Sequence, residues 1–220
     1  MPSSAENVSH IFSLVTISFK ILSLKNLDTN LQALLTGIRN AIGVPALLLF
    51  SAMIGFGSLA QEQGLSLYIS ILSTVLIWGM PGQVVHVELY GLGAPLIAVV
   101  LGVAGANARF MPMTLSMMPV FSDSPHNRKW NYLISHFISI NTWSEMLHRG
   151  REIRADRRLF YFLGFSATCM FAGVIGVYQG YVLFESMPEM VSLCLIFLVP
   201  IYFGLISLIP CILHICWHLF

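Results

Sequence analysis

The chain has 220 residues, of which 56% are hydrophobic and only 10% are charged, and its formal net charge is +1. A soluble domain usually carries about 25% charged residues, whereas segments 159–184 and 190–220 contain no Asp, Glu, Lys or Arg at all. These features exclude an ordinary soluble enzyme, a nucleic-acid binder and a disordered chain, and they indicate an integral membrane protein.

The N-terminal part of the chain is expected to precede the membrane domain. We interpret residues 1–36 as an N-terminal extension and residues 37–220 as the transmembrane domain. Within the extension, residues 28–30 (Asp-Thr-Asn) offer side-chain oxygens for an N-cap. They predict a helix that begins at about Leu31 and lies at the membrane interface.

The long apolar tracts predict an all-α, polytopic membrane protein with about six transmembrane helices. A β-barrel would instead show segments of about ten residues that alternate between apolar and polar side chains. Tract boundaries place the expected spans at 41–60, 65–90, 95–120, 131–147, 159–184 and 190–210.

Two of these spans are expected to be broken. Residues 79–83 (Gly-Met-Pro-Gly-Gln) and residues 105–109 (Gly-Ala-Asn-Ala-Arg) interrupt the second and third tracts. Unwound backbone at membrane depth is tolerated only where protein or a water-filled cavity covers it. Transporters use such breaks to direct helix ends at a substrate. We therefore favour a binding site at the breaks over a proline kink that serves packing alone.

The distribution of Lys and Arg among the short loops predicts the orientation. Loop 148–158 contains five arginines, and the segment before the first span contains Lys20, Lys25 and Arg39. Both segments are expected to be cytoplasmic. Six spans satisfy this arrangement and place both termini inside the cell.

Several polar residues lie inside the apolar tracts. An Arg near the centre of a membrane helix costs roughly 2.5–3.5 kcal/mol, so Arg109 should face the bundle interior or a wet cavity and have a partner, for which Glu88 is one candidate. Two interpretations remain open, a structural ion pair and contact with an anionic ligand. In the fourth tract Asn141 and Glu145 share a helix face, and hydrogen bonding between helices would also explain them.

These residues resemble the AzlC family, the large subunit of bacterial branched-chain amino acid exporters. The resemblance covers about residues 37–210 and is most specific at Asn107-Ala108-Arg109. Two departures stand out, Ser51-Ala52-Met53 in place of Pro-Phe-Gly and an uncharged Asn141 segment in place of an acidic one. The other matching elements are Gly37-Ile38-Arg39, Gly57, Ala60, Gly64-Leu65-Ser66, Trp78 to Gln83, Gly93 to Leu96, Leu115-Ser116 and His136-Phe137.

The resemblance implies a proton-coupled secondary transporter of the inner (plasma) membrane that exports L-valine and related amino acids. It also implies a small, four-span partner subunit of the AzlD type. An amino acid zwitterion needs a cation for its carboxylate, acceptors for its ammonium group and an apolar pocket for its side chain. The expected substrate-binding residues are Pro81, Gly82, Gln83, Glu88, Asn107, Arg109, His136 and Asn141.

Two alternatives come from other functional classes. The chain could be a non-catalytic assembly subunit whose polar residues only tie helices together. It could also be an intramembrane metal-dependent enzyme that uses His86, Glu88, His136 or Glu145, although no nucleophile elbow, His-Glu-x-x-His run or Asp pair supports this. We expect a lipid-embedded protein with no catalytic residues, no metal, no cofactor and no nucleic-acid partner.

Overall fold

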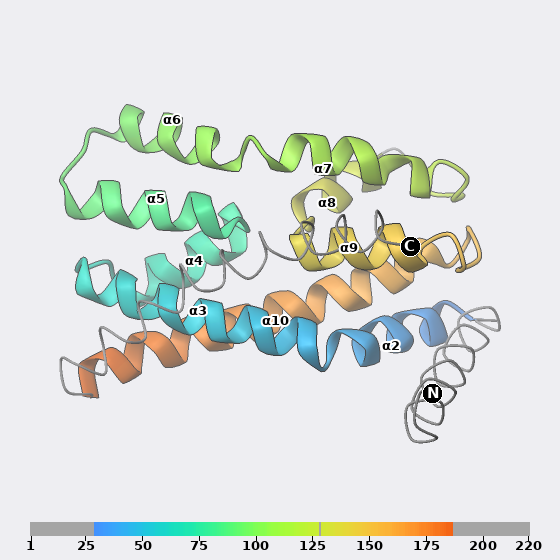
Figure 1. Ribbon diagram of the computed structural model, residues 1–220, viewed down its shortest axis with the longest axis horizontal. Coiled ribbons are helices and arrows are strands. Elements are labelled where there is room, and N and C mark those ends of the chain that lie inside the picture. Colours follow the sequence, from blue (N-terminus) through green and yellow to red (C-terminus); the bar gives the residue numbers. More distant parts are fainter. Residues whose placement is uncertain (1–28, 128, 187–220) are drawn as a thin grey trace, which may run out of the picture. The chain divides into compact units, whose positions relative to one another are not determined.

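The structure is a computed structural model that describes residues 29–127 and 129–186. In that part of the chain, nine α-helices and one short 3-10 helix form, with no strand (Figure 1). The predicted all-helical class is therefore confirmed. The expected sixth span, residues 190–210, lies outside the described residues. The boundary expected between residues 36 and 37 stays a prediction.

The described residues form two compact units. The first unit consists of residues 29–40 and 112–166, and the second unit consists of residues 41–111 and 167–186.

The second unit contains a helix pair that is closely packed through small residues. Here α3 (Val44–Glu62) packs against the later part of α10 (Arg158–Ser186). A Cβ atom added to Gly57 would lie 2.9 Å from the Tyr181 nitrogen, and one added to Gly180 would lie 2.7 Å from the Ile54 carbonyl carbon. The Ser58 hydroxyl donates a hydrogen bond to the Gly180 carbonyl at 3.0 Å. Glycine at these positions lets the two backbones approach, as is common between membrane helices.

The same unit contains three further helices, α4 (Leu67–Ile77), α5 (Met80–Gly91) and α6 (Leu96–Asn107). Figure 1 shows α5 and α6 lying side by side, joined by the turn at residues 92–95. Gly93 allows this turn because its φ of +65° is one that side chains with a Cβ rarely adopt. The turn brings the C-terminal end of α6 back beside the N-terminal end of α5.

The first unit contains α2 (Asn30–Ala41), most of α7 (Phe110–Met117), η1 (Met118–Phe121), α8 (Trp130–His136), α9 (Ile140–Arg149) and the first turns of α10. Helix α2 begins where the sequence predicts, and the Thr29 hydroxyl accepts a hydrogen bond from the Gln32 N–H at 3.2 Å. This contact is the expected N-cap. A Cβ atom on Gly164 would meet the backbone of Leu34, so α2 and α10 also approach closely.

Two described helices, α3 and α10, are long and apolar enough to cross a membrane. A third span results if α6 and residues 110–121 are taken together across their bend. Of the expected spans, 41–60 corresponds to α3, which begins only at Val44, and 159–184 lies within the continuous helix α10. The total of about six spans stays a prediction.

Both expected breaks are present, but each is shorter than predicted. The first consists of Trp78 and Gly79, and residues 80–83 already form the first turn of α5. The second consists of Ala108 and Arg109, while residues 105–107 complete α6. Pro81 explains why α5 already begins inside the first predicted break, because at the start of a helix its missing N–H removes no hydrogen bond.

The prediction of a continuous fourth span, 131–147, is wrong. The chain forms α8 and α9, separated by residues 137–139. The Ser139 hydroxyl accepts a hydrogen bond from the Thr142 N–H at 3.3 Å, and the Thr142 hydroxyl accepts one from the Ser139 N–H at 2.7 Å. This capping box starts a new helix. His136 and Asn141 consequently belong to different helices.

Candidate functional site at two helix breaks

The first break, between α4 and α5, places an aromatic residue in an unusual backbone conformation. Trp78 has a φ of +41°, in the left-handed region that bulky residues rarely occupy, and its side chain is buried. Gly79 then begins α5 as an extended N-cap residue that contributes no side-chain cap. The first N–H groups of α5 therefore need partners from outside the helix.

Asn107, at the end of α6, supplies one of those partners. Its side-chain oxygen accepts a hydrogen bond from the Gly82 N–H at 3.2 Å. A Cβ atom on Gly79 would lie 2.5 Å from that oxygen, and one on Gly82 would lie 2.7 Å from the Asn107 Cγ. Both glycines are thus needed for the close approach. The break at residues 108–109 and the break at residues 78–79 lie against each other in one unit.

A cluster of buried, unpaired polar atoms surrounds the first break. Gln83 is fully buried, and neither its amide nitrogen nor its amide oxygen has a hydrogen-bond partner among the described residues. The Trp78 indole nitrogen and His86 Nδ1 are also buried without a hydrogen-bond partner among the described residues. His86 lies one turn after Pro81–Gly82 on α5. Each buried, unsatisfied polar group costs about 1–3 kcal/mol. Buried polar groups of this kind mark a place where water, an ion or a ligand can supply the missing partner.

Arg109 lies in the second break and is exposed. Its guanidinium carbon is 5.4 Å from the centre of the Phe110 ring, a geometry in which the cation and the ring attract each other. Glu88 lies on α5 with an exposed side chain. The Phe110 ring therefore positions the guanidinium group. The pairing of Arg109 with Glu88 stays a prediction.

The structure brings some of the expected site residues together at the breaks and places two others in the first unit. Pro81, Gly82, Gln83 and Asn107 come together at the breaks. His136 and Asn141 belong to the first unit, where His136 is exposed at the end of α8 and its ring contacts Phe137 edge-on. Asn141 is half-buried in the first turn of α9.

Sequence reasoning left two residues out of the expected substrate site, Trp78 and His86. Trp78 directly precedes the predicted break at residues 79–83, but nothing in a single sequence indicates that its indole nitrogen lacks a partner among the described residues. His86 was considered only as an acid–base or metal group. Its position, three residues after Gln83 on α5, was the available signal, since residues three apart are neighbours on a helix.

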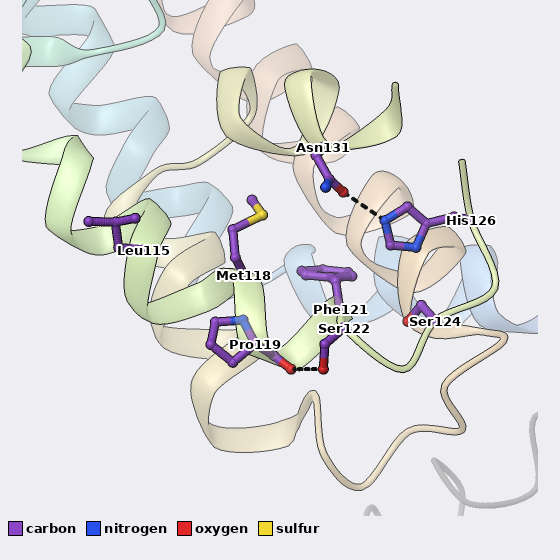
Figure 2. A pocket seen from close by; sticks show the side chains of 8 residues that line it. All are labelled: Leu115, Met118, Pro119, Phe121, Ser122, Ser124, His126 and Asn131. Carbon is purple, nitrogen blue, oxygen red and sulfur yellow. Dashed lines mark hydrogen bonds between the residues drawn. The ribbon is translucent and has the colours of Figure 1, made fainter. Parts of the chain in front are cut away.

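The first unit contains a pocket of about 500 Å³. Figure 2 shows the side chains that line it. One side of it is closed by the hydrogen bond between His126 Nε2 and the Asn131 side-chain oxygen, at 2.8 Å. The lining residues are Leu115, Met118, Pro119, Phe121, Ser122, Ser124, His126 and Asn131. None of the expected substrate-binding residues is among them. In the described part of the chain, no group of three His, Cys, Asp or Glu residues could hold a metal ion.

Long apolar helices, together with helices that break beside buried polar groups, are features of a multi-pass membrane protein. The AzlC protein family matches residues 45–187, which include both breaks, and the chain belongs to this family. Membership associates it with membrane transport and not with enzymes. No curated protein and no solved structure matches the chain.

Proposed function

We propose that this chain is a secondary transporter that exports branched-chain amino acids such as L-valine. The observation that carries the proposal is the fully buried Gln83 beside the Gly82–Asn107 contact, whose amide has no hydrogen-bond partner among residues 29–127 and 129–186. In a family associated with membrane transport, such an amide has a natural partner in a substrate that brings both donors and acceptors. An α-amino acid carries an ammonium donor and a carboxylate acceptor on one carbon.

The substrate carboxylate would bind at the N-terminal end of α5. The positive end of the helix dipole favours an anion there. Asn107 now holds the Gly82 N–H with a side-chain oxygen that resembles one oxygen of a carboxylate. Arg109, which follows the same break, would add the positive charge that a carboxylate needs in a poorly solvated site.

The ammonium group would donate to the Gln83 amide oxygen and to the last backbone carbonyls of α4, where that helix ends. Glu88 would supply the carboxylate of α5. The branched side chain needs an apolar surface. Trp78 and Met80 are both buried at the break and supply such a surface. His136 and Asn141 stay predicted substrate contacts whose part in the site has to be tested separately.

The proposal includes a proton gradient as the driving force and a small, four-span partner of the AzlD type. Helix α6 has no buried residue in this chain, and Leu96, Ile97 and Leu101 are each at least 65% exposed. Apart from the face that lies on α5, this apolar helix is uncovered among the described residues, which suits contact with lipid or with another membrane subunit. The proposed location is the inner membrane, with the N-terminus and loop 148–158 on the cytoplasmic side.

Counterflow of radiolabelled L-valine in proteoliposomes tests the proposal. Liposomes are loaded with unlabelled valine and contain either the chain alone or the chain with its partner. We expect labelled valine to accumulate transiently in at least the second preparation, and leucine or isoleucine to compete. Absence of counterflow in both preparations, with both proteins inserted, would refute the substrate assignment.

A further inference from the structure

Glu145 lies at a junction of three helices in the first unit. The Tyr161 hydroxyl, in the first turn of α10, donates a hydrogen bond to Glu145 Oε1 on α9 at 2.5 Å. The side-chain amide of Asn40, on α2, donates to the Tyr161 hydroxyl oxygen at 2.9 Å. A chain of two hydrogen bonds thus runs from α2 through α10 to one carboxylate oxygen.

The same oxygen attracts a cation from its own helix. Arg149 Nη1 lies 3.4 Å from Glu145 Oε1, one turn further along α9. Two charged or titratable groups among the described residues contact this carboxylate, Arg149 on α9 and Tyr161 on α10. On α2, the uncharged Asn40 contacts the Tyr161 hydroxyl. Both contacts with the carboxylate, from Arg149 and from Tyr161, fit the ionised form of Glu145, because hydrogen bonds to a carboxylate are short and strong.

The two members of the central hydrogen bond differ in their access to water. Tyr161 is fully buried, whereas 17% of the Glu145 side chain is exposed. Tyr161 also lies in the first turn of a helix long enough to span the membrane, next to the arginine-rich loop. The carboxylate is therefore placed where it can exchange a proton with water while its other side contacts the helix bundle.

We propose that Glu145 is the proton-carrying group of coupled transport and that Tyr161 is a positioning residue that favours its ionised form. This inference rests on the proposed function. When a proton from water forms an O–H bond on the carboxylate, the negative charge disappears. The attraction of Arg149 and the hydrogen bond from Tyr161 then weaken together, so α9 is held less firmly to α10. Release of the proton to water restores both contacts.

A purely structural tie between helices is the competing explanation, and one substitution separates the two. In Glu145→Gln the side-chain oxygen can still accept the Tyr161 hydrogen bond, so a structural tie survives. The amide cannot take up a proton. A structural role thus predicts little change, whereas the proton-carrying role predicts loss of coupling alone.

The test compares two assays in proteoliposomes that contain the chain and its partner. One measures L-valine counterflow with equal pH on both sides, and the other measures L-valine accumulation driven by an imposed pH gradient. We expect Glu145→Gln to keep counterflow and to lose driven accumulation. Glu62→Gln, at the exposed end of α3, is the matched control and should keep both. A folded Glu145→Gln protein that keeps driven accumulation, or that loses both activities, would overturn the inference.

A second variant keeps the inference testable if Glu145→Gln does not fold. Tyr161→Phe removes the donor to the ionised carboxylate, so the pH dependence of driven accumulation should move toward higher pH while counterflow persists. An unmoved pH profile would overturn the inference.

Absence of valine counterflow in the wild type contradicts the substrate assignment instead. In that case, an infrared difference spectrum between alkaline and acidic buffer decides, because Glu145→Gln should lose one protonated-carboxyl band, and an unchanged spectrum would overturn the inference.

Discussion

The backbone N–H of Gly82 donates a hydrogen bond to the side-chain oxygen of Asn107, although the two residues are 25 positions apart. This contact joins the first turn of α5 to the last residue of α6. An unsatisfied backbone group in the bilayer interior costs several kcal/mol. The Asn107 side chain therefore stabilises the broken geometry, and it occupies a position that a substrate carboxylate would favour.

Asn107→Ala should abolish transport and destabilise the protein, because the Gly82 N–H loses its partner at a cost of about 1–3 kcal/mol. Asn107→Asp retains an acceptor oxygen and should keep more of the stability. Counterflow and thermal denaturation in detergent measure the two effects.

Gly82→Ala should act through the same contact, because its Cβ atom would displace the Asn107 side chain. The double variant with Asn107→Ala should then be little worse than either single variant, since residues in direct contact are not additive. Fully additive losses would show that Gly82 and Asn107 act independently.

Gln83→Leu separates stability from function. It removes two buried polar atoms that have no partner among the described residues and retains a similar volume. We expect an equal or higher melting temperature in detergent, because no unsatisfied group remains, together with a severe loss of L-valine transport. A variant with normal transport would remove Gln83 from the site.

The parts of the fold that the sequence predicts are those controlled by local composition. Helices α3 and α10 follow from long apolar tracts, which in a bilayer have no alternative to helix. The breaks follow from Gly79 with Pro81 and from the polar run that ends at Arg109. The split between α8 and α9 was missed, because Ser and Thr near residue 139 are equally compatible with a continuous membrane helix.

The contacts that were not predicted are those that depend on tertiary packing. Nothing in one sequence pairs Gly82 with Asn107, or shows that Gln83 is buried without a partner. Tyr161 stands in a charge-free tract and carries no signal of its contact with Glu145. The sequence therefore predicted which segments contain the site, and the structure adds which atoms in them are paired or unpaired.

Arg109→Gln should abolish transport while leaving membrane insertion intact, since the charge and not the volume is lost. Arg109→Lys keeps the charge but loses the planar, bidentate geometry that suits a carboxylate, so partial activity is expected. Counterflow, with surface labelling to verify insertion, measures both variants. Full activity of Arg109→Gln would leave only a structural role for this residue.

Gly180→Ala should destabilise the protein, because the added Cβ atom would lie 2.7 Å and 2.8 Å from the backbone carbons of Ile54. Overpacking of this kind typically costs 1–3 kcal/mol, about as much as a lost core contact. Gly105→Ala is the matched control, since among the described residues nothing beyond its chain neighbours and its own helix backbone lies within 4 Å of its Cβ position. Thermal denaturation should show a lower melting temperature for Gly180→Ala only. Equal melting temperatures would mean that α3 and α10 do not require a glycine at this crossing.

The most direct test of the substrate site is calorimetric titration of the purified protein with L-valine, in the presence of the partner subunit. The wild type should bind L-valine saturably, and Gln83→Leu should bind it much more weakly while remaining folded. Equal affinities for the two proteins would contradict a substrate site at the breaks beside Gln83 and Asn107.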